Sequence, residues 1–108
     1  MAVHAEISIV PITGRKSASM STQIAAAFKA IRSVRGVHAT LTALGTQIEA
    51  ENLERVLEAV SAAHMAARSS GAQRIITSVR IDERLDKNQT LEDKIESVSR
   101  KLSRPKRR

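Results

Sequence analysis

Residues 74–82 read Arg-Ile-Ile-Thr-Ser-Val-Arg-Ile-Asp, and this stretch is the clearest strand pattern in the chain. β-Branched side chains dominate it, and successive side chains of a strand point to opposite faces. Residues 3–12 alternate in the same way, so the sequence predicts a second long strand there. The expected apolar faces carry Ile75, Thr77, Val79 and Ile81 in one strand and Val3, Ala5, Ile7 and Ile9 in the other.

Two helix patterns and one hairpin pattern lie between these strands. The first helix has the apolar stripe Met20, Ile24, Ala27, Phe28, Ile31 and Val34 and ends at Gly36. Residues 38–43 and 46–50 predict two strands joined around residues 44–45. Asn52 is a suitable N-cap for the second helix, whose apolar face is Leu53, Val56, Leu57, Val60, Ala63, His64 and Ala67.

A charged loop follows residue 82, and a last helix follows the loop. Thr90 and Asp93 resemble a capping box, and Leu91, Ile95, Val98 and Leu102 give this helix an apolar face. The element order predicts an α+β ferredoxin-like βαββαβ fold: an antiparallel sheet with two helices on one face, plus a C-terminal helix. We expect a single domain over residues 1–102 and a basic, disordered tail over 103–108.

The predicted fold leaves one face of the sheet without helices. Such a polar face suits a partner subunit, a small ligand or both. The side chains expected on it are His4, Glu6, Ser8, Thr40, Thr42, Gln47, Glu49, Ser78 and Arg80.

Composition excludes several classes of function. The chain has 108 residues and no cysteine, so disulfides and zinc–thiolate sites are excluded. It has neither an apolar run long enough to span a membrane nor a signal-peptide pattern at its start, so no membrane partner and a cytoplasmic location are expected.

The net charge of +7 raises the question of nucleic acid. Six cations lie in the last nine residues, and without them 12 basic residues face 11 acidic ones, a net charge of +1. The predicted open face also carries no aromatic side chain on which bases could stack, since Phe28 is the only aromatic residue. We therefore do not expect nucleic acid as a partner, and weak polyanion binding through residues 104–108 stays as an alternative.

The charged residues of the open face suggest three kinds of chemistry. Glu6 and Glu49 can serve as a general acid and base, can bind a cationic ligand, or can simply pair with Arg80.

The loop Gly14-Arg15-Lys16-Ser17 lacks the spacing of a phosphate-binding P-loop. Two interpretations of this loop stay as alternatives, a looser anion site and a plain loop that begins a helix. His64 is interpreted as a packing residue, and no histidine pair supports a metal. We expect no catalytic residues, no metal site and no enzymatic activity.

Several segments in order resemble the small thiamine-binding family, the single-domain relatives of YkoF-type proteins. They are residues 5–11 (Ala-Glu-Ile-Ser-Ile-Val-Pro), 45–49 (Gly-Thr-Gln-Ile-Glu), 63–64, 71–77 (Gly-Ala-Gln-Arg-Ile-Ile-Thr) and 79–87 (Val-Arg-Ile-Asp-Glu-Arg-Leu-Asp-Lys), then Thr90, Asp93 and Lys94. The similarity spans roughly residues 3–102. Ala50 departs from the glycine usual in the family, and the basic tail is an addition.

This resemblance implies a non-catalytic protein that binds thiamine or its hydroxymethylpyrimidine part and forms dimers or tetramers through its sheets, without a cofactor. The aminopyrimidine amine and the thiazolium cation would meet Glu6 or Glu49, and Arg80 would orient the acids or meet a phosphate. Hydroxyl groups would come from Ser8, Thr46 and Ser78. The alternative is a regulatory or structural module that uses the same face only for self-association.

Overall fold

The computed structural model describes residues 2–14 and 19–103. The elements follow one another as β1 (Val3–Ile12), α1 (Ser21–Arg32), β2 (Val37–Leu41), β3 (Thr46–Ala50), α2 (Leu53–Ser69), β4 (Arg74–Glu83) and α3 (Leu91–Ser103). The predicted basic tail, apart from Ser103 in α3, and residues 15–17 of the expected anion loop lie outside the described residues. Within the described part of the chain, no helix is both long enough and apolar enough to cross a membrane.

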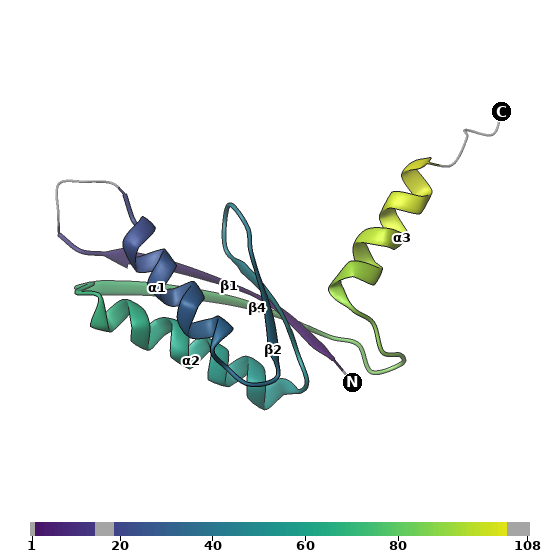
Figure 1. The fold of residues 1–108 in the computed structure, drawn as a ribbon, viewed down its shortest axis with the longest axis horizontal. Helices are drawn as coiled ribbons and strands as arrows, with labels where there is room; N and C mark the ends of the chain where they lie inside the picture. Colours follow the sequence, from purple (N-terminus) through teal and green to yellow (C-terminus); the bar gives the residue numbers. More distant parts are fainter. Residues whose placement is uncertain (1, 15–18, 104–108) are drawn as a thin grey trace.

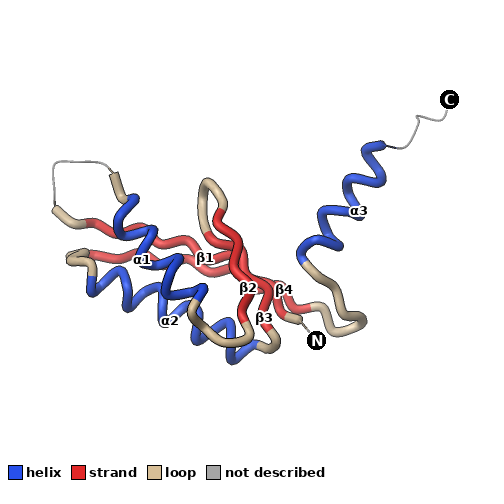
Figure 2. The backbone as a smooth tube through the Cα atoms, in the orientation of Figure 1, coloured by secondary structure: helices blue, strands red, loops and turns tan. Residues whose placement is uncertain are grey.

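The four strands form one antiparallel sheet in the order β2-β3-β1-β4. Helices α1 and α2 lie side by side on one face of it, as Figures 1 and 2 show. This arrangement confirms the predicted ferredoxin-like α+β fold. We call the sheet face without α1 and α2 the open face.

Strand register decides which side chains reach each face. Ala5 lies between Ile48 of β3 and Ile81 of β4, and Ile7 lies between Thr46 and Val79. The helix-covered side of β1 and β3 is therefore apolar and packs against α1 and α2. The core consists of Val3, Ala5, Ile7, Ile9, Ala27, Ile31, Ile48, Ala50, Val56, Ala59, Ala63 and Ala67.

Small alanines in the helices let them approach the sheet closely. Ala59, Ala63 and Ala67 of α2 are fully buried, and the backbone N–H of Arg55 donates to the Asn52 side chain at 3.0 Å, which confirms the predicted N-cap. On the same helix, His64 Nδ1 lies 2.7 Å from Thr77 Oγ1 of β4. His64 is thus hydrogen-bonded within the helix–sheet layer.

The hairpin differs slightly from the prediction. β2 ends at Leu41 rather than at residue 43, because the Thr42 backbone N–H and hydroxyl both donate to the carbonyl of Gly45, at 2.9 and 2.7 Å. Thr42 therefore belongs to a closed turn and not to the strand face expected for it.

The last helix stands apart from the two-layer body. α3 leaves the sheet near the N-terminal end of β1 and points away from the body in Figure 1, and none of its residues is buried. The predicted capping box is present: Asp93 N–H donates to Thr90 Oγ1 at 3.0 Å, and Thr90 N–H donates to Asp93 Oδ2 at 2.9 Å.

Candidate functional site

Two adjacent rows of residues place polar side chains together on the open face. In one row, Glu6 of β1 lies between Gln47 of β3 and Arg80 of β4. Two residues along the strand, His4 lies between Glu49 and Asp82. Alternation in a strand sends both rows to the same face, so side chains from three strands meet there.

Glu6 is held by its two neighbours. Its Oε1 lies 3.6 Å from Arg80 Nη2, and Gln47 Nε2 donates to its Oε2 at 3.5 Å. Both contacts are long, and the Arg80 side chain is 85% exposed. An exposed ion pair of this kind contributes at most about 1 kcal/mol, so a ligand can replace it at little cost.

His4 is the exception among the polar residues of this face, because it is buried. It is 5% exposed, and its Nε2 lies 3.5 Å from Glu49 Oε1 without forming a hydrogen bond. Nε2 is a buried atom with no hydrogen-bond partner within the described residues. Leaving such an atom unpaired costs about 1–3 kcal/mol, which makes it a natural contact for a bound molecule.

The first turns of α3 close one side of the two rows. Glu49 Oε1 accepts a hydrogen bond from the Leu91 backbone N–H at 2.8 Å, and Lys94 Nζ donates to Asp82 Oδ2 at 2.5 Å. The hydrogen bond and the positive charge of Lys94 lower the pKa of Asp82. The start of α3 is therefore anchored to β3 and β4 by polar contacts.

These groups surround a pocket of about 500 Å³, which lies within the size range of small-molecule sites. It combines carboxylates, cations, an amide and an imidazole with apolar side chains from α3. A planar polar molecule with hydrogen-bonding edges, cationic or anionic, suits such a lining. The lining residues are His4, Ala5, Glu6, Gln47, Arg80, Ile81, Asp82, Leu91, Lys94 and Ile95.

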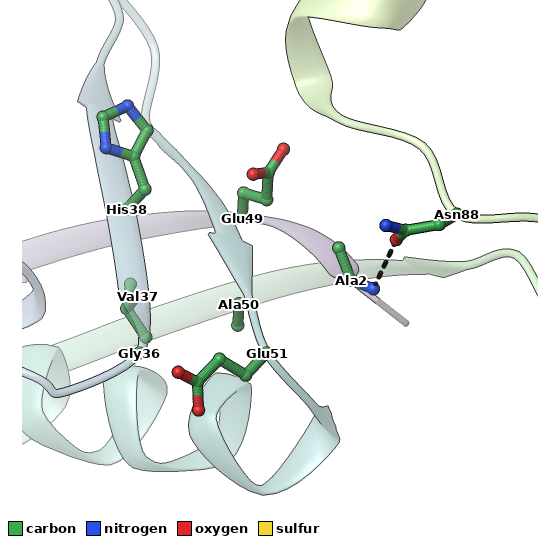
Figure 3. Close-up of a pocket in the computed structure, with 8 residues that line it drawn as sticks. All are labelled: Ala2, Gly36, Val37, His38, Glu49, Ala50, Glu51 and Asn88. Carbon is green, nitrogen blue, oxygen red and sulfur yellow. Dashed lines mark hydrogen bonds between the residues drawn. The ribbon is translucent and has the colours of Figure 1, made fainter.

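A second hollow of about 580 Å³ lies on the other side of Glu49. Figure 3 shows that Glu49 and His38 project to one side of the hairpin, whereas Glu51 turns to the other. Asn88 Oδ1 accepts from the Ala2 backbone N–H at 3.0 Å. The polar side chains around this second hollow therefore point in different directions. We take the 500 Å³ pocket, which the first turns of α3 border, as the candidate site and call it the pocket beneath α3. Among the described residues, no group of three or more His, Asp or Glu side chains is arranged to hold a metal ion.

The predicted site residues fall into three groups. Glu6 and Arg80 line the candidate pocket, and Glu49 borders it through its contacts with His4 and Leu91. Ser8 and Ser78 face each other in the next row beyond Glu6, outside the lining. Thr46 lies on the helix-covered face, where it pairs with Ile7 and is 5% exposed, so the structure does not bring it to the other five.

Sequence reasoning missed two sets of pocket residues. His4 and Gln47 were expected on the open face but not in the site, and the alternation that selected Glu6 selects them equally. Leu91, Lys94 and Ile95 were missed because nothing in the sequence states where the last helix lies. One signal for the position of this helix was available: Lys94 and Asp82 carry opposite charges on the two sides of a loop and can pair.

A family model and the sequences of known proteins indicate the same family for this chain. A family model described as thiamine-binding protein matches residues 5–99. A UPF0045 protein of Methanothermobacter thermautotrophicus is 39% identical over 100 residues, which cover 93% of this chain and 99% of that protein. The UPF0045 protein YqgV of Bacillus subtilis is 37% identical, over 91% of this chain and 95% of its own length.

Solved structures agree with the fold. The hypothetical protein MJ1052 of Methanocaldococcus jannaschii superimposes with a TM-score of 0.80 at 32% identity, covering 91% of this chain and 96% of that one. A protein of Thermotoga maritima, whose proposed role is in thiamine biosynthesis or salvage, gives a TM-score of 0.74 at 21% identity, covering 91% and 99%. At that identity the second likeness concerns the fold alone.

Proposed function

The chain belongs to the thiamine-binding protein family, and we propose that it binds thiamine or its hydroxymethylpyrimidine part in the pocket beneath α3 without catalysing a reaction. We propose further that it acts as a homo-oligomer, a dimer or a tetramer that associates through its sheets. The cytoplasmic location expected from the sequence is part of the same proposal. The observation that carries the binding proposal is the buried, unpartnered Nε2 of His4 in a pocket that also holds Glu6 and Arg80.

The chemistry of thiamine fits this lining. Its aminopyrimidine ring has an amine donor beside ring-nitrogen acceptors, and its thiazolium ring is a cation. Glu6 can accept from the amine or offset the positive charge, and His4 can bond to a ring nitrogen. Ile95 and Leu91 supply an apolar wall. No aromatic side chain is present to stack on the ligand, so we expect an affinity in the micromolar range, about −8 kcal/mol.

The contacts of the two carboxylates fit a binding pocket. Glu49 accepts a backbone hydrogen bond from Leu91, and Glu6 contacts Gln47 and Arg80. Both acids that the sequence offered as a general acid and base therefore take part in the polar contacts of the open face.

Isothermal titration of the full chain tests the binding proposal. Thiamine, thiamine diphosphate and hydroxymethylpyrimidine are titrated separately at one near-physiological salt concentration. We expect saturable heat with at least one of them, near one site per chain. The absence of heat with all three at millimolar concentration would overturn the proposal and leave self-association as the use of the open face.

Variants then test whether the heat comes from this pocket. Glu6→Gln removes the acceptor charge but keeps the size of the side chain, and we expect it to weaken thiamine binding about tenfold, the loss of one charge-assisted hydrogen bond. Glu54→Gln, the same change in the exposed first turn of α2, is the matched control and should bind like the parent. Equal affinities for both variants would contradict the site assignment.

A further inference from the structure

A row of four titratable residues crosses the open face, one from each strand. His38 of β2 pairs with Glu49 of β3, Glu49 pairs with His4 of β1, and His4 pairs with Asp82 of β4. Within this row His4 is 5% exposed, whereas His38 and Asp82 are exposed. The row therefore places a buried imidazole between two carboxylates.

The remaining charged groups around His4 come from three elements. Glu6 of its own strand, Arg80 of β4 and Lys94 of α3 line the same pocket. Together with Glu49 and Asp82 they amount to three carboxylates and two cations, so the surroundings carry one net negative charge while the imidazole is neutral. Carboxyl groups ordinarily titrate near pH 4 and lysine and arginine above about pH 10, whereas imidazole changes charge between pH 5 and 8. A proton on His4 is thus the change that cancels this negative charge near neutral pH.

His4 Nε2 has two alternative partners, the ligand and Glu49. In the structure it lies 3.5 Å from Glu49 Oε1 without a hydrogen bond, and the same Oε1 accepts from the Leu91 N–H at 2.8 Å. A protonated ring carries N–H on both nitrogens, and its hydrogen bond to a carboxylate is strongest at about 2.7–2.9 Å. A movement of less than about 1 Å therefore gives protonated His4 a charged partner within the protein.

We propose that His4 is a proton-sensitive switch of the pocket beneath α3: the neutral ring binds the ligand through Nε2, and the protonated ring binds Glu49 instead and weakens the affinity for a cationic ligand. The inference rests on the proposed function, because thiamine carries a cationic thiazolium ring. An imidazolium beside that ring repels it and removes the net negative charge that attracts it. The coupling is reciprocal, so thiamine binding in the range where His4 titrates releases a proton.

Isothermal titration of the full chain with thiamine at pH 8 and at pH 5.5 measures the switch. We expect a Kd about tenfold weaker at pH 5.5, the equivalent of one charge-assisted hydrogen bond. At an intermediate pH, titrations in two buffers of different ionisation enthalpy count the protons released. We expect a release of up to one proton per chain.

Histidine variants assign the released proton, because the chain has only three histidines. His4→Gln keeps a polar side chain that takes up no proton in this range, so it should bind equally at both pH values and release none. His38→Gln changes an exposed residue of the same row outside the pocket and should keep the pH dependence of the parent. Titration of thiamine itself or of the α-amino group is common to all these chains and cancels in the comparison.

The imidazole signals of His4 in the NMR spectrum of the parent test the switch without a substitution. Thiamine should lower the fraction of protonated His4 at a fixed pH. Equal affinity at both pH values without proton release, or a pH dependence that His4→Gln retains, would overturn the switch and leave the proposed function intact. Failure of thiamine to bind at either pH would also overturn the switch; the proposed function falls with it only if thiamine diphosphate and hydroxymethylpyrimidine do not bind either.

Discussion

Replacing His4 by leucine separates a binding role from a structural one. His4 Nε2 is buried without a hydrogen-bond partner, which costs about 1–3 kcal/mol. Leucine is apolar and of similar size, so His4→Leu relieves that cost. It also removes the 3.5 Å contact with Glu49, worth at most about 1 kcal/mol at a partly exposed pair. We therefore expect the free energy of unfolding to stay the same or to rise by up to about 3 kcal/mol, and each 1 kcal/mol raises Tm by roughly 4–8 °C in a domain of this size.

The affinity should move in the opposite direction. If His4 bonds a ring nitrogen of the ligand, its loss costs about 1.4 kcal/mol, a tenfold weaker Kd for thiamine. Urea unfolding and isothermal titration of the same preparation measure both quantities. His38→Leu is the matched control, since His38 is exposed on the same face and lies outside the pocket, and it should change neither. A fall of 1–3 kcal/mol in the free energy of unfolding with unchanged affinity would make His4 a structural residue with no part in binding.

The remaining predictions concern the fold and the anchor of α3. Asn52→Ala removes the side-chain acceptor of the Arg55 N–H and should cost about 1 kcal/mol in urea unfolding. Ile48→Val leaves a small cavity in the core and should cost about 0.5–1.5 kcal/mol in the same assay. Lys94 lowers the pKa of Asp82, so their contact stabilises the folded state above the ordinary carboxyl pKa near 4 and is lost as pH falls through the lowered value. An NMR titration of the Asp82 carboxyl should show this, and Lys94→Met should move the midpoint back up.

The fold was predictable because local signals agreed with one another. Alternation in residues 3–12 and 74–82 assigned the two faces of β1 and of its neighbour β4, and the observed register places Glu6 beside Arg80 on the open face, as expected. Asn52 and the Thr90–Asp93 capping box marked two helix starts correctly. Alternation works here since one face is covered by helices and the other is not, which fixes the register strongly.

The site was predictable only in part. Thr46 was selected for its hydroxyl, but it lies two residues from the buried Ile48 on the same strand. Its side chain therefore points to the helix-covered face. His4 was missed because burial of a polar residue on an open face depends on what lies over it. The start of α3 lines the same pocket as His4, and a loop of seven residues separates α3 from β4. Periodicity identifies such a helix and its apolar side but does not indicate the surface against which it packs.

An NMR titration of the ¹⁵N-labelled chain with thiamine shows whether the ligand binds on the open face beneath α3. We expect the largest shifts on His4, Glu6 and Arg80. An apolar hollow of about 260 Å³ lies instead between α1 and the β2–β3 turn, with Ile24 and Leu44 in its lining. Shifts confined to that hollow, or no shifts at millimolar thiamine, would exclude a thiamine site beneath α3.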